Sequence, residues 1–162
     1  YNIVCSFMST FGIVLINPEI PPNTGNIMRL CANTGCSLHI VKPIGFNLNE
    51  KSLKRAGMDY LKDVKTLIYE NISDFLNKSL FKRYFLISKY GETSYSQIKF
   101  YKNDCFIFGS ESSGIPKHVI EKLKNSKKIY IPMAAESRSL NLANSVSIII
   151  YEAFRQNRFQ FL

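Results

Sequence analysis

The sequence has few of the features that mark metal-binding, disulfide-rich or membrane-spanning chains. It contains four cysteines and two histidines, and no two cysteines form a C-x-x-C pair, so we expect neither a zinc site nor a disulfide framework. No apolar run approaches the roughly 20 residues that a transmembrane helix needs. The opening residues lack the basic region of a secretory signal. We therefore expect reduced thiols, no metal, no membrane span and a cytoplasmic protein.

Acidic residues are scarce relative to basic ones. The chain has 21 Lys and Arg against 12 Asp and Glu, which gives a formal net charge of +9 at pH 7. Such an excess favours polyanionic partners because it is attracted to phosphate. RNA, DNA and anionic membranes all fit this charge. A solvated lysine-rich surface fits it as well, because the basic residues occur in small groups along the chain.

The order of apolar and polar segments predicts a single α/β domain. Short apolar runs that do not alternate cleanly with polar residues are typical of strands buried on both faces, and helical patterns lie between them. This alternation predicts a mostly parallel sheet flanked by helices. Composition does not shift, so we expect residues 1–162 to form one domain with 1–11 as a short N-terminal extension. We expect strands at 12–17, 38–41, 84–88, 105–108 and 128–131, a weaker one at 63–68, and helices at 24–34, 50–56, 72–78, 116–124 and 142–155.

The first polar segment, residues 17–35, follows a predicted strand. Its prolines favour an extended loop, after which Asn23 or Thr24 would cap a helix that Gly35 ends. Open α/β sheets bind ligands just past the carboxyl ends of their strands. A solvated helix face would more often carry Lys and Glu, so the polar face of this helix indicates a binding site. That face consists of Asn26, Arg29 and Asn33.

Two further loops each join a predicted strand to a helix. Residues 106–116 place two glycines around the lone carboxylate of Glu111, and this loop is not a P-loop because no Lys follows its G-x-x-x-x-G. A plain tight turn also fits this loop. Residues 131–146 carry a run of polar side chains before the last helix. Helix capping explains one of Ser139 and Asn141 but not the whole run.

Together the three segments resemble the signature motifs of the SPOUT RNA methyltransferases. They read N-P-x-I-P-P-N-T-G-N-x-x-R-x-C-A-N-T-G, F-G-x-E-x-x-G-x-P and I-P-M-x-x-x-S-R-S-x-N-L-x-N-x-V-S, and the likeness spans residues 12 to about 155. Within that class the chain is similar to the small enzymes that methylate the wobble ribose of tRNA. The resemblance implies the SPOUT fold, in which the C-terminal segment threads through a loop as a deep trefoil knot. Nothing in the periodicity indicates such a knot, because true knots are rare.

The resemblance also implies the reaction and its residues. S-adenosyl-L-methionine (SAM) would give its methyl group to the 2′-hydroxyl of nucleotide 34, a cytidine or modified uridine in the tRNA anticodon stem-loop, and leave S-adenosyl-L-homocysteine. Relatives are homodimers in which the first motif of one subunit lies near the cofactor of the other. Arg29, Asn23 and Tyr151 match positions assigned to substrate handling and catalysis. The positions that match the cofactor site are Ile87, Gly109, Glu111, Ile131, Ser139, Leu140 and Asn141.

Other functions remain open at this point. The same machinery could methylate another tRNA position or ribosomal RNA, and a catalytically silent module could keep the fold and bind RNA. A nucleotide-binding regulator would need a Walker lysine or a G-x-G-x-x-G, and the sequence has neither. Some relatives carry a basic residue in place of Ser113 and a Lys in place of Tyr90. Both positions are expected in loops that face the substrate.

Overall fold

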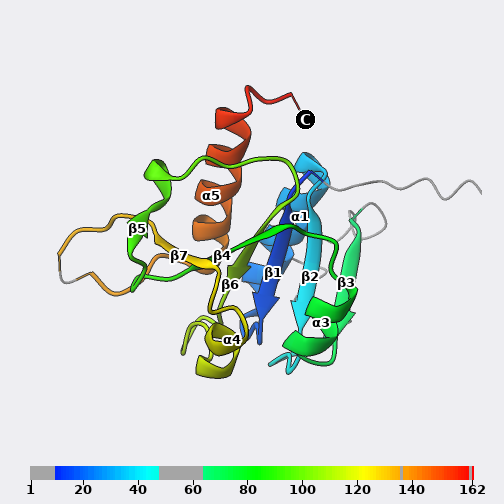
Figure 1. Cartoon of the computed structure of the whole chain (residues 1–162). Coiled ribbons are helices and arrows are strands. Elements are labelled where there is room, and N and C mark those ends of the chain that lie inside the picture. The colour runs from blue at the N-terminus through cyan, green and yellow to red at the C-terminus, as the bar shows by residue number, and fades with distance from the viewer. Residues whose placement is uncertain (1–9, 48–63, 136, 161) are drawn as a thin grey trace, which may run out of the picture.

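The computed structural model describes residues 10–47, 64–135, 137–160 and 162. Its strands lie in one sheet in the order β3-β2-β1-β6-β4-β7-β5, and every pairing is parallel (Figure 1). The predicted parallel sheet is thus confirmed. The strands are β1 (Gly12–Ile16), β2 (Ser37–Val41), β3 (Thr66–Tyr69), β4 (Arg83–Ile87), β5 (Thr93–Ser94), β6 (Asp104–Phe108) and β7 (Lys127–Tyr130). The two-residue β5 is the one strand among these that the sequence pattern did not predict.

Helices cover both faces of the sheet. They are α1 (Pro21–Thr34), α3 (Ile72–Lys78), α4 (Lys117–Lys122) and α5 (Leu142–Gln156), with a short 3-10 turn at Tyr95–Gln97. The helices expected at 72–78 and 142–155 are confirmed almost to the residue, whereas the helix expected at 50–56 lies outside the described residues. Within the described part of the chain, no helix is both long enough and apolar enough to cross a membrane.

Alternate side chains of each central strand point to opposite faces of the sheet. In β1, Ile13 and Leu15 pack in the cluster that contains the buried residues of α1 and α5, while Val14 and Ile16 pack with α3 and α4. Every residue of β1, β2 and β6 is buried. Because both faces are covered, these strands need no polar face, which explains why their sequences do not alternate.

Helix α1 begins earlier than the sequence pattern suggested. It starts at Pro21, with Ile20 as an N-cap residue that makes no side-chain cap, so the predicted capping by Asn23 or Thr24 is wrong. Proline suits the first helical position because its φ is already helical and its missing N–H would have no partner there. The end is as predicted: Gly35 has a φ of 69° and its N–H donates to the Cys31 carbonyl over 2.8 Å.

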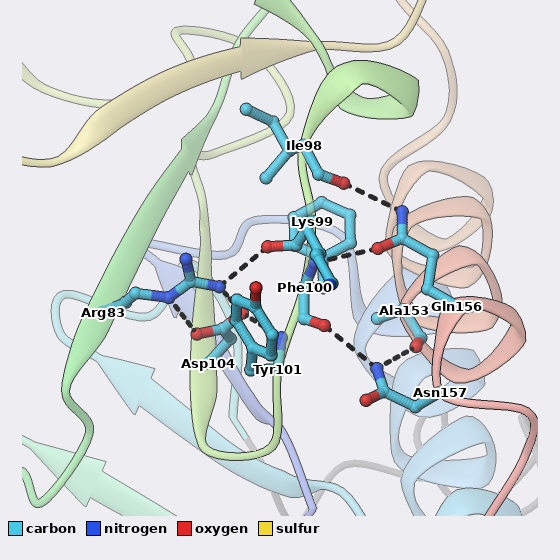
Figure 2. Close-up of polar contacts among 9 residues, drawn as sticks. All are labelled: Arg83, Ile98, Lys99, Phe100, Tyr101, Asp104, Ala153, Gln156 and Asn157. Atoms are coloured by element: carbon cyan, nitrogen blue, oxygen red, sulfur yellow. Dashed lines mark hydrogen bonds and ion pairs between the residues drawn. The ribbon is translucent and has the colours of Figure 1, made fainter.

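The segment Ile98–Tyr101 fastens the end of α5 to the rest of the domain (Figure 2). Gln156 accepts a hydrogen bond from the Phe100 amide over 2.8 Å and donates to the Ile98 carbonyl over 2.9 Å. The amide of Asn157 donates to the Phe100 carbonyl over 3.1 Å. These contacts satisfy the backbone of two buried residues of an irregular segment, Ile98 and Phe100, with two side chains at the end of one helix.

An ion pair holds the other side of the same segment. The Asp104 side chain, only 2% exposed, accepts from Arg83 Nε and from the Tyr101 amide, each over 2.7 Å. Arg83 also donates to the Lys99 carbonyl over 3.0 Å (Figure 2). The segment is thus bonded both to the starts of β4 and β6 and to α5, and it keeps the helix in place over the sheet.

Strand β7 lies between β4 and β5, so the connection between these two strands crosses it. Residue Ser88 donates to the Ile129 carbonyl and Glu92 to the Lys128 carbonyl, each over 3.0 Å. A Cβ on Gly91 would lie 2.4 Å from the Ile129 carbonyl carbon, so this close crossing requires glycine. The chain after β7 therefore leaves the sheet beside this connection. That arrangement is consistent with the predicted knot, which itself stays a prediction.

Candidate active site

A cavity of about 750 Å³ opens at the carboxyl edge of the sheet. Its lining includes Ile87 and Phe108, the last residues of β4 and β6, and Ile131 directly after β7. The rest comes largely from the loops that follow these strands, at 88–90, 109–115, 133 and 139–141. A parallel sheet concentrates its loops at this edge, which is where such folds bind ligands.

The structure gathers most of the site residues expected from the sequence around this cavity. Asn23 lines it, although it comes from α1. Arg29 and Tyr151 do not: Arg29 is exposed on α1, and Tyr151 is 46% exposed on α5. All seven positions expected to bind the cofactor line the cavity, namely Ile87, Gly109, Glu111, Ile131, Ser139, Leu140 and Asn141.

The chemistry of the lining is divided. Ile87, Phe108 and Leu142 offer apolar surface, whereas Ser139 and Asn141 offer hydroxyl and amide groups at the start of α5. The volume lies within the roughly 300–1,000 Å³ of small-molecule sites. The cavity therefore fits a small molecule that has both an apolar and a polar part.

The carboxylate of Glu111 holds the chain just before α1. It accepts from the Glu19 amide over 2.9 Å, from the Ile20 amide over 3.1 Å and from the Asn23 side-chain amide over 2.9 Å. A carboxylate is favoured here because the start of a helix carries partial positive charge and unpaired N–H groups. The loop after β6 therefore determines how the chain enters α1.

Asn23 links Glu111 to the start of α5 through a second hydrogen bond. Its side-chain oxygen accepts from the Asn141 amide over 2.8 Å, and the Asn141 oxygen caps α5 by accepting from the Asn144 amide over 3.2 Å. An ionised carboxylate can only accept, so Glu111 fixes the orientation of Asn23 and, through it, that of Asn141. One directed chain of hydrogen bonds thus joins the three polar segments beside the cavity. Asn23 is 5% exposed and both ends of its amide are used in this chain.

A second carboxylate, that of Glu19, bonds in the opposite direction, from the loop before α1 to the loop after β6. The sequence reasoning missed it. Glu19 accepts from the Ser112 amide over 3.1 Å and from the Ser112 hydroxyl over 2.8 Å. Each of the two loops therefore presents a glutamate to the backbone of the other. The partners lie 93 residues apart in sequence, so no local pattern could have revealed them.

The loop after β6 folds back tightly on itself. Ser110 and Gly114 exchange backbone hydrogen bonds of 3.1 and 3.0 Å. A Cβ on Gly109 would lie 2.0 Å from the Gly114 carbonyl carbon, and Gly114 has a φ of 71°. Both glycines are thus required by the geometry of the cavity wall.

Neither the histidines nor the described cysteines, Cys31, Cys36 and Cys105, line this cavity. His39 is buried within β2 and His118 is exposed on α4, and neither lines the cavity. The described residues contain no group of three His, Cys, Asp or Glu side chains that could hold a metal ion.

Comparison with known proteins identifies the family. The model of the SpoU rRNA Methylase family matches residues 10–151. A curated tRNA (cytidine(34)-2'-O)-methyltransferase from Yersinia pestis is 45% identical over 149 residues, which cover 89% of this chain and 92% of that protein. This chain therefore belongs to the SpoU rRNA methylase family.

Two solved structures share the fold. One, described as giving structural insights into the 2-OH methylation of C/U34 on tRNA, is 39% identical with a TM-score of 0.86, and the match covers 93% of this chain and 97% of that one. The other is the SpoU methyltransferase AviRb from Streptomyces viridochromogenes in complex with AdoMet. It is 19% identical with a TM-score of 0.82, and the match covers 94% of this chain and 62% of that one. The predicted SPOUT architecture is thereby confirmed.

Proposed function

We propose that this protein is a SAM-dependent methyltransferase that modifies the ribose 2′-hydroxyl of nucleotide 34, the wobble nucleotide, in tRNA. The observation that carries the proposal is the cavity at the carboxyl edge of the sheet, which all three motif loops line and one hydrogen-bond chain braces. The name of the Yersinia pestis relative supports both the reaction and the nucleotide. A tRNA substrate also fits the net charge of +9 and the expected cytoplasmic location.

The lining of the cavity fits SAM. Ile87 and Ile131 would form an apolar slot for adenine, with Gly109 and Leu140 beside it. Ser139 and Asn141 would bind the polar methionine end. SAM supplies a methyl group already activated on a sulfonium, so the protein has mainly to position the acceptor and assist loss of its proton.

Arg29 is the residue we assign to the acceptor oxygen. Arginine stays protonated in proteins, so it serves poorly as a general base. Its planar, charged fork can instead stabilise the developing alkoxide and orient a neighbouring RNA phosphate, which is able to accept the proton. Asn23 acts differently: with its amide bonded to Glu111 and Asn141, it holds the first motif against the cavity wall.

A homodimer would complete the site. Arg29 and Tyr151 lie on the exposed faces of α1 and α5, which pack against the same side of the sheet, and neither lines the cavity of its own chain. In a symmetric dimer built on these helices, each subunit would supply Arg29 and Tyr151 to the cofactor of the other.

The first experiment separates cofactor binding from transfer. Arg29→Ala should abolish methyl transfer from labelled SAM to tRNA yet leave the affinity for S-adenosyl-L-homocysteine, measured by calorimetry, nearly unchanged. Ser139→Ala should weaken that affinity first. Equal loss of affinity and transfer in Arg29→Ala would contradict the assignment. Nucleoside mapping that finds the label at another tRNA position, or in ribosomal RNA, would favour those substrates instead.

Mixing the two variants, at a SAM concentration too low for Ser139→Ala to bind it, tests the dimer. If Arg29 serves the partner subunit, a dimer of one Arg29→Ala chain and one Ser139→Ala chain contains one intact site, so random exchange should restore about a quarter of wild-type activity. If Arg29 serves its own subunit, the mixture should stay as inactive as its components.

A further inference from the structure

A smaller hollow adjoins the cofactor cavity. It has a volume of about 330 Å³ and shares Lys89, Tyr90, Ile131 and Met133 with that cavity. Its remaining lining comes from Tyr130, Ala134 and Ser137. We call it the side hollow. Because the two spaces share these four residues, an RNA that enters the cofactor cavity from this side would also contact the side hollow.

Tyr90 lies where the cofactor cavity and the side hollow meet, and its ring is not packed in the core. Its residue is 79% exposed, and among the large hydrophobic residues that the structure describes only Leu80 is more exposed. The Lys89 ammonium lies 5.1 Å from the centre of the Tyr90 ring. Among the described residues that line the side hollow, Lys89 is the one charged side chain. This corner of the site therefore presents an aromatic ring beside an ammonium group.

The turn that carries Tyr90 is held firmly. The Tyr90 amide donates to the Ser88 hydroxyl over 3.2 Å, and the Gly91 amide donates to the Ser88 carbonyl over 3.0 Å. Ser88 itself is bonded to Ile129 of β7. Because these bonds fix the backbone of the turn, little backbone entropy remains to be lost when a ligand stacks on the ring.

We propose that the side hollow binds an unpaired nucleobase of the RNA substrate, stacked on Tyr90, with Lys89 beside the adjoining phosphate. This inference rests on the proposed function, because it requires an RNA whose ribose enters the neighbouring cavity. RNA-binding proteins recognise splayed single-stranded bases by stacking them on aromatic rings, and cations serve the backbone. A volume near the lower end of the range for small-molecule sites suits one planar base.

Replacement of Tyr90 tests the stacking. Tyr90→Ala should raise the KM for tRNA roughly 10-fold, whereas Tyr90→Phe, which keeps the ring, should stay close to wild type. The affinity for S-adenosyl-L-homocysteine should be unchanged in both. The matched control is Tyr101→Ala, which removes a half-exposed tyrosine near the start of β6, at the other end of the sheet. It should leave the KM for tRNA unchanged, and melting curves should show that all three variants fold.

A binding assay keeps the test independent of methyl transfer. Anticodon stem-loop RNAs with 2-aminopurine at successive loop positions are titrated into the protein in the presence of S-adenosyl-L-homocysteine. Fluorescence at one position should be quenched by wild type and Tyr90→Phe but not by Tyr90→Ala. Equal quenching by all three would overturn the inference, and so would a parallel loss of cofactor affinity in Tyr90→Ala. Position-specific quenching without any methyl transfer would refute the proposed function alone.

Discussion

Lowering the pH should destabilise this protein through His39, which is 6% exposed in β2. Its Nε2 lies 2.9 Å from the Ser37 hydroxyl and its Nδ1 2.9 Å from the Tyr69 hydroxyl. The rings of Phe75 and Phe81 pack edge-on at 5.4 Å. Burial, followed by the charge of Lys65, lowers the pKa of His39 from 6.5 to about 4.

The direction of the pH effect on stability follows from which state, folded or unfolded, binds the proton more readily. Unfolded His39 takes up a proton near its ordinary pKa of 6.5, whereas the folded residue resists until about pH 4. Between these values the unfolded state holds more protons, so the free energy of unfolding falls as the pH falls. The His39 contribution should lower it by about 2 kcal/mol between roughly pH 7 and pH 5.

Urea denaturation at several pH values measures this effect, and His39→Gln isolates it. Glutamine retains a donor and an acceptor but does not titrate in this range. The wild type should therefore lose about 2 kcal/mol more than the variant between the two pH values. His118→Gln, which replaces an exposed histidine on α4, serves as the matched control and should follow the wild-type pH dependence.

Equal slopes for the wild type and His39→Gln would refute the reasoning. A second measurement does not depend on whether the variant folds. In a titration of the folded wild type followed by NMR, the imidazole of His39 should remain neutral at pH 5. A protonated His39 at that pH would mean that burial does not act as described.

Three further changes test the site and its support. Gly109→Ala would place a Cβ 2.0 Å from the Gly114 carbonyl carbon, and calorimetry should show at least ~10-fold weaker binding of S-adenosyl-L-homocysteine, because the cavity wall must shift. Asp104→Asn removes the charge that pairs with Arg83 and should lower the free energy of unfolding in urea by about 2 kcal/mol. The loss should stay below that of a fully buried pair because the Arg83 side chain is 41% exposed and keeps some hydration; no change would discount the ion pair. Glu19→Gln weakens the hydrogen bonds to Ser112 that position α1, so it should lower kcat for tRNA several-fold and leave cofactor affinity unchanged. An unchanged kcat would show that these bonds do not position α1.

Local patterns were enough for most of the secondary structure. The apolar runs at β1, β2, β4, β6 and β7 and the 3.6-residue pattern of α5 arise from burial of one stretch of chain at a time, so a short window of sequence contains them. The start of α1 was predicted wrongly because the helix uses Pro21 at its first position, with no side-chain cap, and its flanking amides bond to Glu111. The two-residue β5 was missed because only pairing with β7 makes it a strand.

The site residues were recognised by motif resemblance, and the fold explains why they belong together. Parallel strands bring Gly109 and Ile131, from distant parts of the chain, to one edge of the sheet. The sequence showed both residues but could not show how far apart they lie in the folded protein. The cavity volume, the side hollow and the exposure of Tyr90 are properties of that arrangement alone.

The sequence by itself determined the class of fold, the charge and the polar segments that belong to the site, because each depends on composition or on neighbours along the chain. Only the tertiary structure decided how those segments are connected. Glu111 reaches Asn23 across 88 residues and Asn141 reaches Asn23 across 118. A hydrogen bond depends on distance and direction in space, and those are set when the sheet, its helices and their loops pack together.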